Sequence, residues 1–450
     1  MPARVLIVGA SVRAQVESAL RAGFAVDALD LFADRDTRFL IGRATGESIS
    51  AEQSVASSIS QIQGFSDVLT FMDQFKRCDA AIVCGGIENR IELVEAIEKR
   101  FQLLGPGSDA LSRIGDCVAV QQTMSRCLGP EGINVTSTLR QIQPESKTEQ
   151  LGSPGWLAKK NWSSGGLGVE LADSQAADDS AQTRDSYFQQ KVSGESVSVL
   201  YLSRGDGQSI MDGVSGSATT ILGLTQQLVG DESLGASRFQ YCGSVGPLDP
   251  TEIGQAIDGP NETSPDHLRQ IQRIGDFLAQ QYRLVGVWGI DFIVNQAGVW
   301  PVDVNARLTA SAELYESRIA ATTGFKSIID LHIAACVEST DVPPRSDWAK
   351  LGMGQWGLVE GKLILFSRSS NPIEITNKLS DGLMDQFEVG FFGSDQIGAT
   401  LADIPSAGDS IQPGHPILTI RVRCSSAEEV RVETQGLAER VYRMLERWMC

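Results

Sequence analysis

The chain has 450 residues, of which 42% are hydrophobic and 21% charged, and its formal net charge is −18. This composition excludes a disordered chain, and the length predicts two or three globular domains. A nucleic-acid-binding surface needs clustered Lys and Arg, and no stretch supplies it, so we expect no nucleic-acid partner. An anionic ligand such as a nucleotide would need local cations, backbone N–H groups or a metal ion.

The apolar runs are short, and none approaches the roughly 20 residues that cross a bilayer. The first ten residues are typical of a strand rather than of a signal peptide. The eight cysteines form no CxxC pair, which argues against a zinc ribbon or a disulfide scaffold. The three histidines, His267, His332 and His415, lie far apart. We therefore expect a cytoplasmic protein with reduced thiols and no membrane partner.

Strand and helix patterns alternate through the first hundred residues, which predicts a parallel sheet with helices on its faces. Ser11 is placed to cap the first helix, and Gly23 is placed to end it. The turn after the first strand lacks GxGxxG, so nicotinamide binding is not expected. Strands are predicted at residues 4–9, 26–32, 80–84 and 102–104, and helices at residues 12–22 and 89–100.

A lysine- and glycine-rich segment follows a predicted strand at residues 156–158. Lys159 and Lys160 precede the sequence NWSSGGLG at residues 161–168. Such a loop can surround phosphates with backbone N–H groups while a lysine neutralises their charge. The segment is no Walker A motif, and a plain Gly-Ser hairpin loop is the alternative.

A further strand is predicted at residues 187–192 and is followed by Ser193, Gly194 and Glu195. The exposed backbone at such an edge can bind adenine, and Glu195 is placed to accept a hydrogen bond from a ribose hydroxyl. The alternative is an ordinary buried strand and turn.

Residues 286–307, GVWGIDFIVNQAGVWPVDVNAR, predict a hairpin with Gly298 at the left-handed position of a three-residue loop. We expect Asn295 to pair with Val299, which places Asp291 opposite Asp303. Residues two apart share a face of a strand, so Asn305 and Arg307 lie beside Asp303.

Two carboxylates and an amide oxygen then converge on one patch. Like charges directly opposite each other destabilise a sheet, and hard oxygen ligands suit Mg²⁺. Arg307 adds a planar cation suited to a phosphate or carboxylate. An exposed hairpin with solvated Asp side chains is the alternative for either Asp alone, but Asp303 and Asn305 are both poor strand formers within an apolar run.

The last part of the chain begins after a predicted helix at residues 325–338, where Pro343 and Pro344 favour a domain boundary. Two strands and a closing helix are predicted beyond it, at residues 362–366, 417–422 and 426–448.

Taken in order, these motifs resemble the ATP-grasp superfamily. The matching features are the Lys and glycine loop, the Gln189-Gln190 strand, GxDF at residues 289–292 and DVNAR at residues 303–307, where the family usually reads EVNPR. The resemblance covers roughly residues 1–335 and is nearest to a branch of ATP-dependent carboligases related to biotin carboxylase. Some members of that branch accompany methanopterin- or methanofuran-linked one-carbon genes, and tyramine–glutamate ligase is a related activity. Residues 402–420 resemble the C-terminal portion of the same branch.

The resemblance implies a mixed α/β and α+β fold. A Rossmann-like domain would span residues 1–110, an ATP-grasp core of two α+β subdomains residues 111–338, and a small β-rich C-terminal domain residues 339–450. It also makes a homodimer one option.

The resemblance further implies roles for individual residues with ATP and Mg²⁺, or Mn²⁺ as an alternative ion. Lys159 and Arg307 would be catalytic, with Lys159 on the nucleotide phosphates and Arg307 on the transferring phosphoryl group. Glu88, at a strand end of the N-terminal domain, would help to bind the acceptor; a helix cap by Glu88 or Asn89 is the alternative. Gly165, Gly166 and Gly168 would form the loop over the phosphates, and Gln190, Lys191 and Val192 would flank adenine. Glu195 would contact the ribose. Asp291, Asp303 and Asn305 would hold the metal ion.

Several positions depart from the family pattern. Residue 303 is Asp where Glu is usual, Lys160 and Ala306 stand where proline is common, and Gln190 stands where Glu is frequent. Arg113 is the one candidate for the nucleotide-binding cation expected early in the core. These departures bear on turnover rate and on nucleotide affinity.

The expected activity is an ADP-forming carboxylate–amine ligase. A carboxylate would become an acyl phosphate, and an amine would displace the phosphate to give an amide, with glutamate ligation in one-carbon cofactor synthesis as one setting. Three rivals stay open: carboxylation through carboxyphosphate, a nucleotide-binding protein without turnover, and a Rossmann oxidoreductase.

Overall fold

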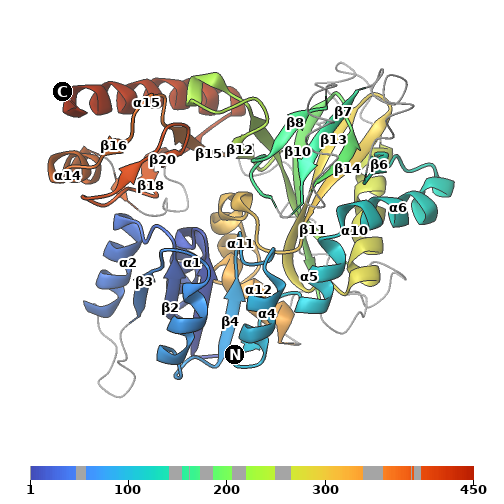
Figure 1. Ribbon diagram of the computed structural model, residues 1–450, viewed down its shortest axis with the longest axis horizontal. Helices are drawn as coiled ribbons and strands as arrows, with labels where there is room; N and C mark the ends of the chain where they lie inside the picture. The colour runs from blue at the N-terminus through green and yellow to red at the C-terminus, as the bar shows by residue number, and fades with distance from the viewer. Residues whose placement is uncertain are drawn as a thin grey trace.

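The structure is a computed structural model, shown in chain order from blue to red in Figure 1. The N-terminal part lies low in this view, the middle of the chain at the upper right, and the C-terminal part at the upper left. The described residues are 2–46, 57–140, 155–161, 163–172, 186–204, 219–248, 265–337, 358–386, 388–389 and 397–449.

Five parallel strands form the N-terminal sheet in the order β3-β2-β1-β4-β5, which confirms the predicted α/β unit. Every residue of β1 is buried, so its sequence is a nearly continuous apolar run. The strand order reverses between β1 and β4, and open parallel sheets bind ligands beyond the strand ends at such a point. The elements are β1 Arg4–Gly9, β2 Ala25–Asp30, β3 Ser58–Gln61, β4 Ala80–Val83, β5 Gln102–Leu103, α1 Arg13–Ala22, α2 Arg35–Gly46, α3 Asp67–Phe71 and α4 Ile91–Glu98.

Helix α1 differs from the prediction at its first turn. The capping position is Val12 rather than Ser11, and the Val12 side chain has no hydrogen-bonding atom. The Val12 N–H donates instead to Oδ2 of Asp30 at 2.6 Å, so the end of β2 supplies the acceptor. At the other end, Gly23 closes the helix with φ of 92°, as predicted.

A nine-stranded sheet runs from the middle of the chain into its C-terminal part, in the order β14-β13-β10-β11-β12-β15-β20-β18-β17. Strand β12 pairs with β15 in an antiparallel ladder. The predicted boundary near residues 341–346 lies outside the described residues, and the three domain limits remain predictions. The strands are β10 Glu195–Ser203, β11 Thr219–Val229, β12 Tyr241–Gly246, β13 Gly286–Asn295, β14 Gly298–Asn305, β15 Val359–Phe366, β17 Glu388–Val389, β18 Gly398–Ala402 and β20 Pro416–Cys424.

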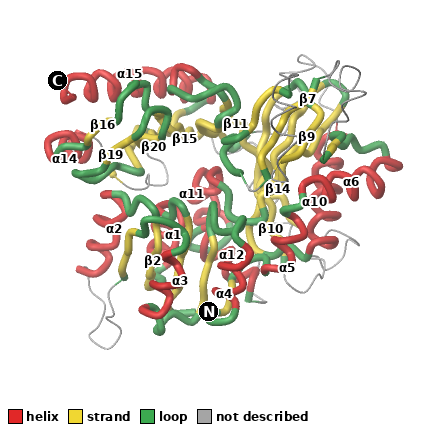
Figure 2. The backbone as a smooth tube through the Cα atoms, in the orientation of Figure 1, coloured by secondary structure: helices red, strands yellow, loops and turns green. Residues whose placement is uncertain are grey.

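Two smaller sheets complete the β-structure, and Figure 2 shows β7 and β9 of the larger one beside the mid-chain strands. The four-stranded sheet has the order β6-β9-β7-β8, and β16 pairs with β19. Their bounds are β6 Thr138–Leu139, β7 Trp156–Lys160, β8 Val169–Leu171, β9 Ser186–Gln190, β16 Ile373–Glu374 and β19 Ser410–Ile411.

Helices cover these sheets, and the buried apolar side chains form three large clusters. One cluster joins β1 and β4 to α12, so a helix from the middle of the chain packs on the N-terminal unit. No helix in the described ranges combines the length and apolar character needed to span a bilayer. The helices are α5 Ser108–Ile114, α6 Cys117–Leu128, α10 Pro265–Tyr282, α11 Glu316–Thr322, α12 Ile328–Cys336, α14 Asn377–Gln386 and α15 Ala427–Met449, with 3₁₀ turns η1 Met72–Gln74, η2 Gly129–Glu131, η4 Glu232–Leu234 and η5 Ala310–Tyr315.

Candidate active site

A cavity of about 950 Å³ lies where the N-terminal sheet, the four-stranded sheet and the nine-stranded sheet meet. Most of the residues predicted from the sequence line it. Those that do are Glu88, Lys159, Gly165, Gly166, Gln190, Lys191, Val192, Asp291, Asp303, Asn305 and Arg307.

The carboxylate hairpin has the predicted pairing at its functional end. Asp291 on β13 lies opposite Asp303 on β14. The predicted pairing at the tip is wrong, because Asn295 pairs with Gly298 rather than with Val299. A register shift next to Asp291 compensates for this difference, since a bulge places one extra residue on β14 before Asp303. The carboxylates therefore face each other because of a bulge that the sequence pattern did not reveal.

Asp291 is a buried carboxylate with one oxygen that has no hydrogen-bond partner among the described residues. Its Oδ2 accepts a hydrogen bond from Nδ2 of Asn305 at 3.1 Å. Its Oδ1 is buried and has no hydrogen-bond partner among the described residues. Burial, and then the charge of Asp303, raise the pKa of Asp291 to about 6. A cation at this point would offset both effects.

Asn305 does not present its oxygen to the two carboxylates as predicted. Its Oδ1 accepts from Nη2 of Arg307 at 3.2 Å, while its NH₂ group faces Asp291. The amide therefore links the acidic pair to the arginine.

Arg307 bridges the hairpin and the N-terminal unit. Its Nε donates to Oε1 of Glu88 at 2.5 Å, across 219 positions of sequence. Burial alone would lower the pKa of Arg307, but the charge and hydrogen bond of Glu88 outweigh it and raise the pKa. The other oxygen of Glu88, Oε2, is buried without a hydrogen-bond partner in the described part of the chain. Glu88 is thus a side chain of the site, and its role as a helix cap is not seen: Arg90 holds the capping position of α4.

Lys159 on β7 reaches toward the same hairpin. Its Nζ donates to Oε1 of Gln189 at 2.9 Å and lies 3.4 Å from the carbonyl oxygen of Val302. Gln189 also donates from Nε2 to that carbonyl, at 3.2 Å. The motif at Gln189-Gln190 does not indicate this contact, and the position of Gln189 in the ladder of β9 brings it against β14. The two predicted halves of the site, lysine and carboxylates, therefore adjoin.

The glycine loop closes against the start of β12. The carbonyl of Gly165 accepts from the N–H of Tyr241 at 2.9 Å. Gly166 has φ of 75°, and a Cβ there would lie 1.8 Å from the carbonyl oxygen of Phe239. Gly168 has φ of 77° and packs against the side chain of Lys160, and it does not line the cavity. Trp162 of the predicted loop lies outside the described residues.

The predicted adenine-binding strand lies at the cavity wall, but its acidic neighbour does not. Gln190 ends β9, with its N–H bonded to the carbonyl of Ser137 at 2.9 Å. Glu195 begins β10 and is absent from the cavity wall, whereas Ser196 lines it. Successive residues of a strand point to opposite faces, so Glu195 is directed away, and the predicted ribose contact is not supported. Arg113 also lies elsewhere, with Nη2 bonded to the carbonyl of Gln281 at 2.9 Å.

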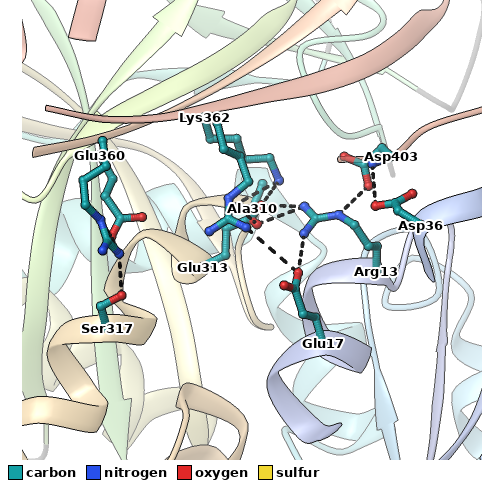
Figure 3. A network of polar contacts seen from close by, with 11 residues as sticks. Arg13, Glu17, Asp36, Ala310, Glu313, Ser317, Glu360, Lys362 and Asp403 are labelled. Atoms are coloured by element: carbon teal, nitrogen blue, oxygen red, sulfur yellow. Dashed lines mark hydrogen bonds and ion pairs between the residues drawn. The ribbon is translucent and has the colours of Figure 1, made fainter. Parts of the chain in front are cut away.

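A buried ionic network forms the far side of the cavity and was missed in the sequence (Figure 3). Glu313 accepts from Nη2 of Arg13 at 2.9 Å and lies 2.5 Å from Nζ of Lys362. Burial opposes ionisation of Glu313, but Arg13, Lys362 and Arg421 outweigh it and lower its pKa. The network ties the N-terminal, middle and C-terminal segments together. The one signal in the sequence was a lysine inside the apolar run of β15.

Residues 128–311, which contain the carboxylate hairpin and the glycine loop, match the family described as ATP-grasp domain. The fold is also similar to that of biotin carboxylase. The biotin carboxylase of Campylobacter jejuni, solved with a β-γ-ATP ligand, superposes with a TM-score of 0.64 at 13% identity, over 96% of this chain and 90% of that one.

Two further solved structures share the fold over nearly the full chain. The N5-carboxyaminoimidazole synthase of Aspergillus clavatus, in complex with ADP and 5-aminoimidazole ribonucleotide, gives a TM-score of 0.62 at 15% identity, with 99% and 98% of the two chains covered. The N5-carboxyaminoimidazole ribonucleotide synthetase of Thermotoga maritima gives 0.58 at 15% identity, with 98% of each chain covered. No protein of curated function matches the sequence. At these identities the likeness shows the fold.

Proposed function

We propose that this protein is a Mg-ATP-dependent, ADP-forming ligase that activates a carboxylate and transfers it to a nitrogen nucleophile. The observation that carries the proposal is the buried, unpartnered Oδ1 of Asp291 beside Asp303, in the same cavity as Lys159 and the glycine loop. The solved relatives with bound ADP or an ATP ligand support a nucleotide in this cavity.

The acidic pair fits Mg²⁺. An oxygen atom without a hydrogen-bond partner and a second carboxylate directly across the ladder are the hard, negatively charged ligands that this ion prefers. Asp291 and Asp303 would hold the ion, and Asn305 would orient Asp291 through its NH₂ group. When bound, Mg²⁺ offsets charge on the phosphates during phosphoryl transfer.

The remaining residues position the nucleotide. Lys159 brings a cation next to the acidic hairpin, where it can contact a phosphate. The loop at Gly165 and Gly166 presents backbone N–H groups, and its anchoring to β12 fixes it as a cover for the phosphates. The strand end at Gln190, Lys191 and Val192 would flank adenine.

The chemistry then needs little beyond positioning and charge. A carboxylate oxygen attacks the γ-phosphorus, the bond to the β,γ-bridging oxygen breaks, and ADP leaves. The amine attacks the acyl carbon, phosphate leaves, and the amide forms with loss of a proton. Arg307 is placed to hold the phosphoryl oxygens, and the free Oε2 of Glu88 is placed to accept a hydrogen bond from the acceptor.

Carboxylation is the second candidate, because the structural relatives are a biotin carboxylase and two enzymes named for carboxyaminoimidazole synthesis. In that case bicarbonate would take the place of the organic acid, and carboxyphosphate would be the activated species. The departures at Asp303, Ala306 and Gln190 are the support for a third candidate, a nucleotide-binding protein without turnover.

The test is ADP release with MgCl₂ and ATP across a panel of acids and amines, glutamate with tyramine first, with and without bicarbonate. Release that needs both an organic acid and an amine supports the ligase. Release that needs bicarbonate instead supports carboxylation. Tight Mg-ATP binding with no release across the panel contradicts both reactions.

A further inference from the structure

Asp34 is a buried carboxyl group whose charged neighbours are mainly acidic: Asp30, Asp36 and Asp403, with Arg13 as a cation nearby. It follows β2, lines the cavity and is only 7% exposed. Its side chain has no hydrogen-bond or ion-pair partner among the described residues. Ionising a carboxyl group at a buried site among like charges is costly unless a cation comes with it, so its presence needs an explanation.

The neighbouring charges are already committed to other groups. Arg13 donates to Asp403, Glu17 and Glu313 at 2.8, 3.1 and 2.9 Å. Lys362 is paired with Glu313. The oxygens of Asp36 accept backbone N–H bonds from Asp403 and Ile404 at 3.1 and 2.9 Å, as Figure 3 shows for the first of them.

The backbone around this cluster is held in an unusual conformation. Ala33 and Asp403 have φ of 47° and 55°, and only one other non-glycine residue of the described chain, Arg283, has a positive φ. Asp30 fixes the loop by accepting the N–H groups of Phe32 and Ala33 at 2.7 and 2.8 Å. Strained conformations of this kind persist where the surrounding structure enforces them and gather at binding sites.

A cation that enters from the cavity would complement this carboxylate. A metal ion fits poorly, because both oxygens of Asp36 already accept backbone N–H bonds and Oδ1 of Asp403 accepts from Arg13, whereas the hairpin offers two carboxylates to an ion. An ammonium group needs only a carboxylate and room for its substituent, and the cavity supplies both.

We propose that Asp34, beside Asp403, binds the positively charged nitrogen of an organic amine that is the second substrate. The assignment rests on the proposed ligase function, since it places the amine in the cavity that holds Asp291 and Arg307. It also separates this chain from a pure bicarbonate-activating enzyme, for which a cationic organic acceptor is not required.

Isothermal titration tests this with three amines, propylamine, 2-phenylethylamine and 1,4-diaminobutane, each compared with the alcohol of the same skeleton. We expect at least one amine to bind the full-length protein saturably and its alcohol to bind at least tenfold more weakly. Asp34→Asn should weaken the binding of that amine at least tenfold and change the affinity for ATP by less than twofold. Asp109→Asn, at a side chain that is 88% exposed on α5, is the matched control.

Asp34→Asn replaces a buried carboxyl group with an amide of nearly the same size, so the melting temperature of the variant should be close to that of the wild type. Three outcomes would overturn the proposal: no amine binds the wild type, the alcohols bind as tightly as the amines, or Asp34→Asn binds amine like the wild type. If amine binding depends on Asp34 but ATP does not bind, then the proposed ligase function fails and this site stands.

Discussion

Replacing Asp291 by Asn should stabilise the metal-free protein and abolish its Mg-dependent activity. The fold raises the pKa of this carboxyl from 3.8 to about 6. At 1.36 kcal/mol per pH unit, that difference amounts to about 3 kcal/mol. The folded state binds the proton more tightly than the unfolded state, so the free energy of unfolding falls as pH rises from 4 to 6 and stays lower above that range.

Chemical denaturation in EDTA measures the effect directly. At pH 7.5 the free energy of unfolding of the Asn variant should exceed that of the wild type by about 3 kcal/mol. At pH 5 the difference should be roughly half as large, because the wild-type carboxyl is then mostly protonated in the folded state. The Asn side chain keeps an oxygen for the bond from Asn305, so little else is lost. With MgCl₂ and ATP the order should reverse, since ligand binding stabilises the wild type alone. A variant that is less stable than the wild type in EDTA at pH 7.5, or equally stabilised by Mg-ATP, would refute the reasoning.

Three further outcomes are expected. Asp303→Asn should lower Mg-dependent ADP release at least 100-fold with unchanged circular dichroism, with Asp109→Asn as control; near-normal release would contradict its role. Gly166→Ala places a Cβ 1.8 Å from the carbonyl of Phe239 at φ of 75°, which costs at least about 1–2 kcal/mol, so the KM for ATP should rise about tenfold. Burial lowers the pKa of His332 to about 4, and the neutral ring accepts from the N–H of Val287 at 2.8 Å. The neutral ring therefore adds about 3 kcal/mol to the free energy of unfolding above pH 6.5, and this is lost as pH falls toward 4. In urea titrations at pH 7.5 and 4, the free energy of unfolding should fall less in His332→Gln than in the wild type.

Local patterns in the sequence were enough to predict the paired carboxylates and the lysine loop. Asp303 within an apolar strand carries its own signal, because a buried carboxylate needs a partner. The bulge beside Asp291 has no such signal, and neither has the shorter loop at the tip, where Asn295 pairs with Gly298. Elements with weak patterns, such as α2 and β3, were also missed.

Contacts between distant segments were beyond reach. The bond between Arg307 and Glu88 joins residues 219 positions apart, and the sequence of neither segment indicates that the other lies beside it. The same holds for Lys362, whose partner Glu313 lies on a different element. The sequence also does not indicate which face of β10 Glu195 occupies. Ser196 lines the cavity, so Glu195 lies on the opposite face of the strand.

The ladder between β12 and β15 has a consequence for how the chain is made. On the ribosome β12 emerges well before β15. The outer backbone groups of residues 243–246 therefore stay unpaired until residues 360–363 have been synthesised. Until then a nascent chain exposes an open sheet edge, which is a template for association with other chains. Truncation before β15 would make that transient hazard permanent, so shortened forms should be recovered as aggregates rather than as a working nucleotide-binding fragment.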